Sequence, residues 1–351
     1  MDAAEATTDR YMARAMELAA GRRTHPNPTV GCVLVRDGAI VGEGFHAGPG
    51  FPHAEIEALR DAGAEAAGSL AYVTLEPCSH HGRTPPCADA LIEAGVSGVV
   101  VAVMDPDDRV AGAGLARLRN AGIAVTVGIS AEGAAGLDPA YVHPRRTGPA
   151  LITQQVAVTL DGVSAADDGS SQWITGPAAR RDGHRLRADS DAVLIGAGTL
   201  RADDPRLDVR LDGYDGRQPR PVVVAGREPL PEESRLAGRS ALVIATEPRV
   251  GWETVVVPGE DGLPDPLAIA RALGDAGLLS VLSEAGARLA GALWRAGATK
   301  RAILYLAPRM AGGAGRSAFT GPVPTLADLS DGSVTDTRTI GPDLRITFER
   351  T

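Results

Sequence analysis

The chain has 351 residues and a mass of 36.1 kDa, which exceeds the usual size of one hydrophobic core and favours two domains. Its net charge of −9 and its 3% aromatic content argue against a broad nucleic-acid-binding surface. The N-terminal segment lacks the basic and apolar parts of a signal peptide, and no apolar run reaches membrane-spanning length. We therefore expect a cytoplasmic protein that binds neither membrane nor nucleic acid.

In the first half of the chain, helical and extended patterns alternate. The predicted order is helix 8–20, strands 29–36 and 39–46, helix 53–62, strand 70–75, helix 86–94, strand 98–103, helix 113–121 and strand 123–127. An Asp37-Gly38 pair predicts a tight turn between the first two strands. Strands that alternate with helices favour a layered α/β domain.

Residues 141–150, with the sequence YVHPRRTGPA, have no apolar period and contain two prolines, so we place the domain boundary in this segment. The second half returns to the α/β pattern. Its apolar strands are predicted at 151–158, 192–196, 221–225, 241–245, 254–257, 278–283 and 302–306, with helices near 177–188, 266–274 and 287–296.

The strongest chemical signal is His53 followed by Glu55, with Cys78 and Cys87 further along the chain. One imidazole and two thiolates would leave one open position on a tetrahedral zinc ion, which is the arrangement of catalytic zinc sites. A carboxylate two residues after the histidine is placed to carry a proton from water to a leaving amine. The pattern therefore predicts a zinc-dependent deaminase acting on a small aminopyrimidine.

One feature departs from the general zinc-deaminase signature, which has two residues between its cysteines, because the segment SHHGRTPP separates Cys78 from Cys87 here. The alternative is two buried cysteines and a surface histidine without metal. Cys32 lies in an apolar strand pattern and is interpreted as a small buried hydrophobic residue. Loop residues that either contact a heterocycle or are simply solvated are Asn27, His46, His80, His81 and Arg83.

The segments HPNPTVG (25–31), HAE (53–55) and TLEPCSHHGRTPPC (74–87) are followed by AVTLDGVSA (157–165), SQWITG (171–176) and RADDPRL (201–207). With these motifs the chain resembles the bifunctional deaminase/reductase family of riboflavin biosynthesis over nearly its whole length. The insertion between the two cysteines is itself a feature of that family. The resemblance implies a cytidine-deaminase-like α/β/α layered domain over residues 1–146 and a dihydrofolate-reductase-like α/β domain over residues 147–351.

The resemblance also implies two consecutive reactions on small phosphoribosylaminopyrimidines. The first is zinc-dependent deamination of 2,5-diamino-6-(5-phosphoribosylamino)pyrimidin-4-one, and the second is NADPH-dependent reduction of the product's ribosyl group to ribityl. In the first domain it implies zinc ligation by His53, Cys78 and Cys87, proton transfer by Glu55, and pyrimidine contacts from Asn27, His46, His80 and Arg83. It further suggests a homo-oligomer.

For the second domain no G-x-G-x-x-G fingerprint is present, so the sequence does not support a Rossmann dinucleotide site. Arginines are natural ligands for the substrate phosphate. By resemblance the substrate contacts are Ser171, Arg187, Leu207, Arg210 and Glu284. The NADPH contacts implied in the same way are Ala157, Trp173, Thr199, Asp203 and the segment Gly286, Ala287, Arg288, Leu289, Ala290, Gly291 and Ala292.

Two positions differ from the family pattern. Gln155 stands where the family usually has lysine, and Thr159 replaces a common serine. The lost positive charge leaves open a second hypothesis, in which the second domain is a non-catalytic binding or assembly module. A third hypothesis, a nucleic-acid deaminase with the same zinc site, requires basic and aromatic surface that this composition does not offer.

Overall fold

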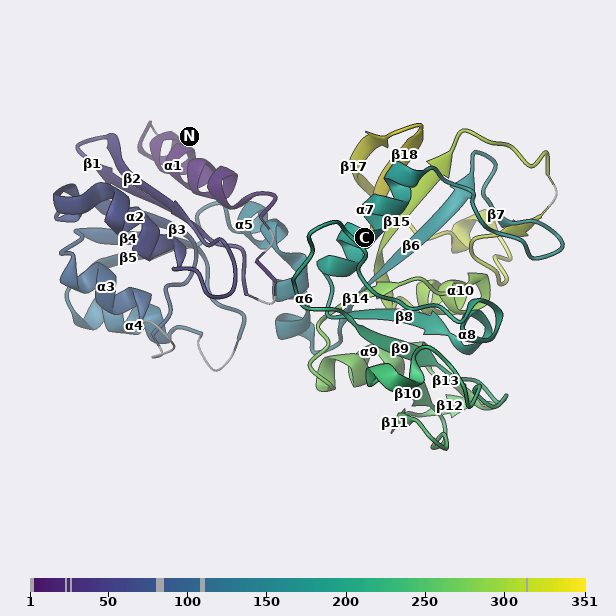
Figure 1. The fold of residues 1–351 in the computed structure, drawn as a ribbon. Helices are drawn as coiled ribbons and strands as arrows, with labels where there is room; N and C mark the ends of the chain where they lie inside the picture. The colour runs from purple at the N-terminus through teal and green to yellow at the C-terminus, as the bar shows by residue number, and fades with distance from the viewer. Residues whose placement is uncertain (1–2, 23, 26, 80–84, 108–110, 314) are drawn as a thin grey trace. The chain divides into compact units, whose positions relative to one another are not determined.

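The computed structural model describes residues 3–351 except 23, 26, 80–84, 108–110 and 314. The chain divides into two compact units, Met1–Thr147 and Gly148–Thr351, so the division lies one residue after the predicted boundary (Figure 1). Within the described ranges, no helix is both long and apolar enough to cross a membrane.

Unit 1, residues 1–147, contains a five-stranded sheet in the order β2-β1-β3-β4-β5. The β1/β2 and β1/β3 pairs are antiparallel, whereas β3/β4 and β4/β5 are parallel. The central strands are almost fully buried, as expected for a sheet with helices on both faces. The strand bounds are β1 Gly31–Arg36, β2 Ala39–Phe45, β3 Leu70–Leu75, β4 Gly98–Val103 and β5 Ala124–Val127.

Helices cover both faces of this sheet (Figure 1). On one face α1 approaches β1 so closely that a Cβ on Gly31 would lie 1.9 Å from the Ala15 carbonyl oxygen. On the other face a Cβ on Gly44 would lie 2.2 Å from the Ala54 carbonyl oxygen, so glycine lets α2 lie directly on β2. The helix bounds are α1 Ala3–Ala19, α2 Ala54–Ala62, η1 Gly63–Ala66, α3 Cys87–Glu93, α4 Ala113–Asn120, α5 Ala131–Leu137 and α6 Pro139–Thr147.

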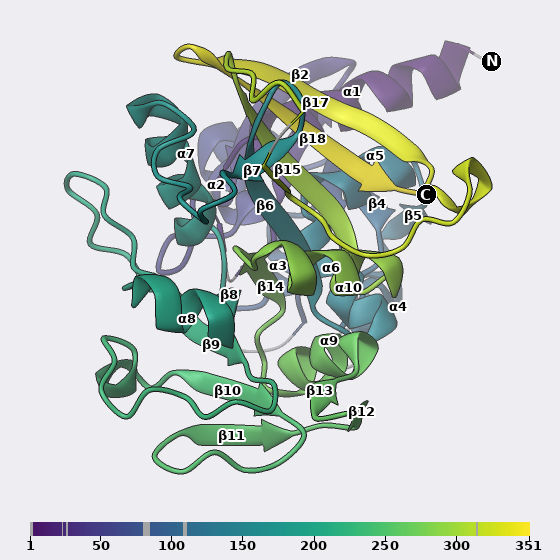
Figure 2. The same cartoon turned by 90° about the vertical axis from the view of Figure 1, so that its right-hand side faces the viewer.

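Unit 2, residues 148–351, contains a nine-stranded sheet in the order β11-β10-β9-β8-β14-β6-β15-β18-β17 (Figure 2). The strands from β11 to β15 are parallel, and β18 and β17 add an antiparallel hairpin at one edge. The bounds of these strands are β6 Leu151–Thr159, β8 Ala192–Gly196, β9 Arg220–Val224, β10 Leu242–Ala245, β11 Glu253–Val256, β14 Ser280–Ser283, β15 Thr299–Ala307, β17 Gly332–Ile340 and β18 Asp343–Arg350.

The remaining elements of unit 2 connect and cover these strands. Two short pairs, β7 with β16 and β12 with β13, lie outside the main sheet. Their bounds are β7 Val163–Ala165, β12 Gly259–Glu260, β13 Leu263–Pro264 and β16 Arg316–Ser317. The helices are α7 Pro177–Ala188, α8 Ala197–Asp203, η2 Ala237–Arg239, α9 Pro266–Asp275, α10 Ala287–Arg295 and η3 Leu326–Asp328. The predicted succession of two α/β domains is confirmed by these sheets and helices.

Several segments differ from the sequence-based expectation, among them the short helices α5 and α8, which were not predicted. Residues 139–147 form helix α6 where no regular structure was predicted. Pro139 occupies its first position, where a proline ring is compatible with helix geometry, and the Arg145 guanidinium lies 3.7 Å from the centre of the Tyr141 ring one turn away. The β17–β18 hairpin was also not predicted, because β17 is mostly exposed and carries few apolar side chains.

Candidate active sites

The predicted metal ligands of unit 1 converge in the structure. His53 is the N-cap residue of α2 and Cys87 is the first residue of α3, while Cys78 follows β3. Their ligand atoms all lie within 4.8 Å of one another. The His53 Nδ1 atom is 3.2 Å from Cys87 Sγ and 3.6 Å from Cys78 Sγ. One ring nitrogen and two sulfur atoms at this spacing form a donor set that suits zinc.

The local electrostatics favour a thiolate at this cluster. Hydrogen bonds from the Cys87 thiol and from His53 lower the pKa of Cys78 well below its ordinary value. The backbone amide of Cys87 also donates to Cys78 Sγ at 3.3 Å. Because the thiolate is the form that binds a metal, Cys78 is prepared for ligation at neutral pH.

Glu55 lies beside the cluster in the first turn of α2 and is only 3% exposed. Burial, together with the negative charge of Cys78, raises the pKa of Glu55 to about 7. A carboxyl group with a pKa near neutrality can both accept and release a proton under working conditions. Glu55 therefore has the burial and acidity of a proton-transfer group.

Two predicted pyrimidine contacts lie next to the metal cluster. The His46 and His53 rings meet edge to face with centroids 5.3 Å apart. His46 Nδ1 donates to the Pro52 carbonyl at 2.9 Å, so its Nε2 accepts from Asn27 Nδ2, also at 2.9 Å. Burial lowers the pKa of His46, which favours this neutral ring. The other two predicted contacts, His80 and Arg83, lie outside the described residues.

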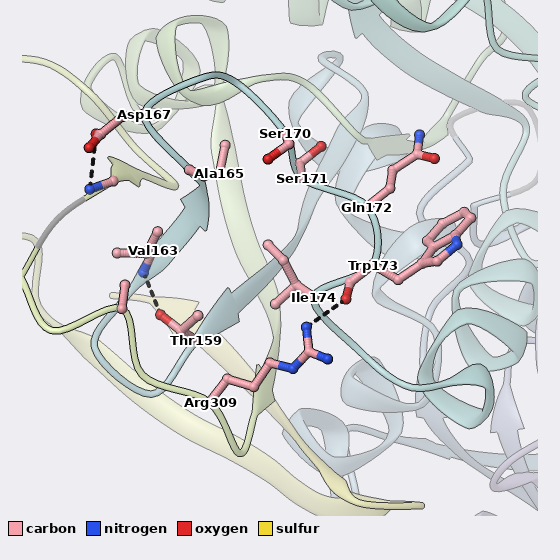
Figure 3. Close-up of a pocket in the computed structure, with 13 residues that line it drawn as sticks. Thr159, Val163, Ala165, Asp167, Ser170, Ser171, Gln172, Trp173, Ile174 and Arg309 are labelled. Atoms are coloured by element: carbon pink, nitrogen blue, oxygen red, sulfur yellow. Dashed lines mark hydrogen bonds between the residues drawn. The ribbon is translucent and has the colours of Figure 1, made fainter.

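In unit 2 a cavity of about 370 Å³ lies beside the end of β6 (Figure 3). Ser171 and Trp173, two predicted contacts, line it together with Thr159. Trp173 is 60% exposed. Its backbone carbonyl accepts a hydrogen bond from Arg309 Nη1 at 2.9 Å, and the Arg180 guanidinium lies 4.5 Å from the centre of its ring. The lining offers the Arg309 guanidinium and the hydroxyls of Thr159 and Ser171, while the Trp173 ring points away from the other labelled residues (Figure 3). Ala157 does not line this cavity and packs instead under α7.

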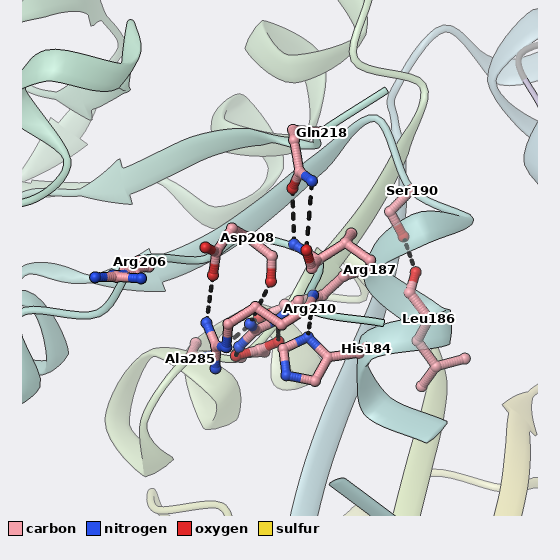
Figure 4. Close-up of polar contacts among 12 residues, drawn as sticks. His184, Leu186, Arg187, Ser190, Arg206, Asp208, Arg210, Gln218 and Ala285 are labelled. Carbon is pink, nitrogen blue, oxygen red and sulfur yellow. Dashed lines mark hydrogen bonds and ion pairs between the residues drawn. The ribbon is translucent and has the colours of Figure 1, made fainter. Parts of the chain in front are cut away.

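A second group of predicted residues forms a polar cluster (Figure 4). Arg187 on α7 binds Glu284 with both ends of its guanidinium, at 2.6 and 2.7 Å. Its Nη1 also donates to the Asp208 carbonyl at 2.9 Å. Arg210 is exposed and pairs with the Asp208 carboxylate. Thus Arg187 holds Glu284 in place, whereas Arg210 remains accessible to a ligand from solvent.

Leu207, another predicted substrate contact, is 2% exposed and has a φ of 51°. A bulky residue rarely adopts this left-handed conformation, and such backbone strain is often found at functional sites. The neighbouring Val209 is fixed by Gln218, which accepts from its amide at 2.7 Å and donates to its carbonyl at 3.3 Å. The loop that carries Arg210 is therefore held in a defined conformation.

Of the predicted cofactor residues on and before α8 and α10, Thr199 and Gly286 lie close together, whereas Asp203 lies apart at the end of α8. Both helices follow neighbouring parallel strands, β8 and β14, so their first turns lie at the same edge of the sheet. A Cβ on Gly286 would lie 3.6 Å from Thr199 Oγ1. The first turn of a helix leaves backbone amides free to bind phosphate, which fits residues 286–292 to the anionic part of a dinucleotide. Asp203 lies at the exposed far end of α8.

Gln155 lies on β6 against α7, where its amide nitrogen would be 3.3 Å from a Cβ on Gly183. Within the described part of the chain, its buried Oε1 atom has no hydrogen-bond partner. The position is thus neutral where the resembled family usually has a lysine.

The sequence did not single out two residues that the structure places at these sites. His184 on α7 accepts a hydrogen bond at Nδ1 from the Arg210 amide at 3.2 Å. Glu76, which precedes Pro77 and Cys78, is 4% exposed and accepts hydrogen bonds from four backbone amides of the described residues. Both residues lie within quoted motifs, His184 in HRLRADS and Glu76 in TLEPC. Their roles depend on contacts with backbone amides, which the sequence does not indicate.

Comparisons with known proteins agree with this arrangement. Residues 5–103 match the family described as the cytidine and deoxycytidylate deaminase zinc-binding region, and residues 150–344 match the RibD C-terminal domain. The riboflavin biosynthesis protein RibD of Escherichia coli K12 is 43% identical to this chain, and the alignment covers 95% of this chain and 97% of that protein. RibD of Haemophilus influenzae is 40% identical, with 96% of each chain covered.

Solved structures give the same result over both units. Acinetobacter baumannii RibD, form 1, matches with a TM-score of 0.85 at 38% identity and covers 99% of each chain. A diaminohydroxyphosphoribosylaminopyrimidine deaminase/5-amino-6-(5-phosphoribosylamino)uracil reductase from Thermotoga maritima has a TM-score of 0.80 at 31% identity, covering 99% of this chain and all of its own. With both catalytic domains matched in one chain, the protein belongs to the RibD family of bifunctional riboflavin-biosynthesis deaminase/reductases.

Proposed function

We propose that unit 1 deaminates 2,5-diamino-6-(5-phosphoribosylamino)pyrimidin-4-one and that unit 2 reduces the product, 5-amino-6-(5-phosphoribosylamino)uracil, with NADPH. The observation that carries the proposal is the convergence of His53, Cys78 and Cys87 beside the buried Glu55. The Thermotoga maritima relative, whose description names both activities, matches along the whole chain. The motifs quoted above support the same substrates.

In unit 1, His53 Nδ1 and the two cysteine sulfur atoms would hold zinc. Bound zinc would supply Lewis-acid activation of water for attack on the amidine carbon. Glu55 would take a proton from that water and deliver it to the departing amine, so that water and the amidine give a carbonyl and ammonia. The neutral His46 and Asn27 would orient the pyrimidine ring, since both lie beside His53. His80 and Arg83 stay as predicted pyrimidine contacts on the strength of the family resemblance.

In unit 2, the cavity beside Trp173 would receive the nicotinamide end of NADPH, and the first turns of α8 and α10 would bind its phosphates. Bound NADPH would supply the hydride. Glu284, aligned by Arg187, would bind hydroxyl groups of the opened ribose. Arg210, which is exposed, would bind the 5-phosphate. Ser171 and the strained Leu207 would complete the substrate contacts.

A coupled assay tests both activities in the purified full-length chain. Ammonia release and NADPH absorbance are followed together after the diaminopyrimidine substrate is added, with and without NADPH. Release of ammonia followed by oxidation of NADPH is expected. Ammonia without NADPH oxidation would identify unit 2 as a non-catalytic module and would direct attention to Gln155.

A single substitution separates the two sites. Glu55→Gln is expected to lower the deaminase kcat by at least about 100-fold, because it removes the proton carrier. Reduction of separately supplied 5-amino-6-(5-phosphoribosylamino)uracil is expected to continue at the wild-type rate. Loss of both activities in this variant would contradict the assignment of two independent sites.

We also propose that the chain acts in the cytoplasm as a homo-oligomer, on the basis of its family resemblance. Light scattering coupled to size-exclusion chromatography measures the mass in solution. A mass of 36.1 kDa would identify a monomer and contradict the proposal. Fractionation of cells that produce the protein tests its location.

A further inference from the structure

Glu76 is a buried carboxylate that four backbone amides surround. Its Oε2 atom accepts from the amides of Asp105 at 3.3 Å and Gly112 at 2.9 Å. Its Oε1 atom accepts from Gly114 at 3.0 Å and Leu115 at 3.4 Å. The first two donors belong to the segment after β4, and the last two belong to the first turn of α4. Glu76 thus joins two parts of the chain that follow the neighbouring strand.

The backbone next to Glu76 is equally constrained. The Glu76 amide donates to the Val103 carbonyl at 2.9 Å, which extends the pairing of β3 with β4 by one step. Pro77 then contacts α4 so closely that a Cβ on Gly114 would lie 1.9 Å from the Pro77 carbonyl oxygen. The chain therefore has little freedom between the end of β3 and Cys78.

Cys78 is held from its other side by the start of α3. The amide of Ala88 donates to the Cys78 carbonyl at 3.1 Å, and the amide of Cys87 donates to Cys78 Sγ at 3.3 Å. Among the described residues, the position of this sulfur thus depends on the contacts from α3 and on the contacts of Glu76. The contacts from α3 begin at Cys87, which is itself a proposed ligand, whereas the Glu76 contacts involve no proposed ligand.

We infer that Glu76 is a positioning residue for the metal ligand Cys78. It fixes the backbone that leads to Cys78 against α4 and the segment after β4, and so keeps Cys78 Sγ within reach of His53 Nδ1. The inference rests on the zinc site proposed above and adds a residue that does not touch the metal. Groups that orient metal ligands commonly change metal affinity by about 10- to 100-fold when they are replaced.

The test compares zinc affinity in the full-length wild-type chain and in Glu76→Gln. Glutamine has the same shape, but its NH₂ group cannot accept from the amides that now face one carboxylate oxygen. Zinc is titrated in competition with the chromophoric chelator 4-(2-pyridylazo)resorcinol. We expect the wild-type chain to bind one zinc ion and the variant to bind it about 10- to 100-fold more weakly.

Asp138→Asn is the control, because Asp138 is a half-buried acceptor of backbone amides in unit 1, from Thr29 at 3.1 Å and Tyr141 at 3.0 Å, but does not lead to a ligand. Its zinc affinity is expected to equal that of the wild-type chain even if its melting temperature falls. Far-UV circular dichroism and the thermal unfolding transition of unit 1 report whether each variant has folded, because all the substituted residues lie in that unit.

A second variant keeps the inference testable if Glu76→Gln does not fold. Gly114→Ala must displace Pro77 and is expected to weaken zinc binding in the same direction. Wild-type affinity in either folded variant, or an equal loss in Asp138→Asn, would overturn the role of Glu76. A wild-type chain that binds no zinc would overturn the proposed metal site as well.

Discussion

At the scale of single residues, His184 supports the loop that carries Arg210. Its Nδ1 atom must be unprotonated to accept the Arg210 amide, so the neutral ring carries its proton on Nε2. Burial, followed by the nearby positive charges of Arg187 and Arg210, lowers the pKa of His184. The ring is therefore neutral at and above the ordinary histidine pKa of about 6.5, and the interaction is lost only as the pH falls further, through the lowered pKa of His184.

This arrangement predicts different outcomes for two substitutions. His184→Asn places an oxygen near the position of Nδ1, so we expect a nearly normal KM for the reductase substrate. His184→Leu removes the acceptor and is expected to raise that KM about fivefold, which corresponds to the loss of one hydrogen bond of about 1 kcal/mol. Steady-state assays of reduction at pH 7.5 measure both values.

The pH profile gives an independent check on His184. In the wild-type chain the KM for the reductase substrate is expected to stay constant down to the ordinary histidine pKa of about 6.5 and to rise as the pH falls further, through the lowered pKa of His184, because protonation removes the Nδ1 acceptor. In His184→Asn this rise should be smaller, since an amide does not titrate. Parallel profiles in the two proteins would show that another group, such as the substrate phosphate, causes the rise.

The residues that the sequence could and could not predict differ in what they contact. His53, Cys78 and Cys87 are recognisable because a metal requires particular side chains in a particular order, and the structure brings them together. His184 and Glu76 act on backbone amides, and neither residue type nor spacing indicates which amides will be near. Such supporting residues become visible only when the fold places distant segments side by side.

At the scale of elements, α7 carries His184 and Arg187 and is fixed to the sheet by a buried polar group. Asp182 on α7 accepts from the Tyr305 hydroxyl at 2.6 Å and from Arg345 Nη1 at 3.0 Å. Burial raises the pKa of Tyr305, so its hydroxyl stays protonated and continues to donate. Tyr305 lies on β15 and Arg345 lies on β18, so the two hydrogen bonds fix the position of α7 on the sheet.

Tyr305→Phe is expected to destabilise unit 2 by about 1–2 kcal/mol, because a buried carboxylate loses one of its donors while Arg345 remains. Denaturant unfolding measures this change. Tyr214→Phe serves as the control, since the Tyr214 hydroxyl donates to the Arg217 carbonyl in an exposed loop and should change stability little. Equal stability of the two variants would show that the Asp182 contact does not fix α7.

Regular elements were predictable where apolar periodicity reports burial. The strands 70–75, 98–103 and 192–196 are almost fully buried, and their apolar runs identified them. Helix α6 and strand β17 were missed because they bury few side chains, so their sequences carry little periodic signal. In strand β18 the apolar residues Leu344, Ile346 and Phe348 alternate with polar residues. This alternation is typical of a strand, although no strand was predicted there.

At the scale of the whole molecule, each unit has its own hydrophobic core. The core of unit 1 involves residues between Tyr11 and Tyr141, whereas the cores of unit 2 involve residues from Ala150 onward. Among the described residues, none of the unit 1 core belongs to a core of unit 2, so the stability of each unit is expected to depend mainly on its own contacts. Zinc would contribute only to unit 1, since its proposed ligands all lie there.

Removal of zinc by dialysis against a chelator is therefore expected to have separable effects. Deamination should be lost and unit 1 should unfold at lower temperature, because a metal that binds only the folded state stabilises it. Reduction of supplied 5-amino-6-(5-phosphoribosylamino)uracil should continue unchanged. Calorimetry with assays of both reactions provides the measurement, and zinc added back should restore the first reaction. A parallel loss of reduction would mean that the second site depends on the integrity of the first unit, which separate cores do not predict.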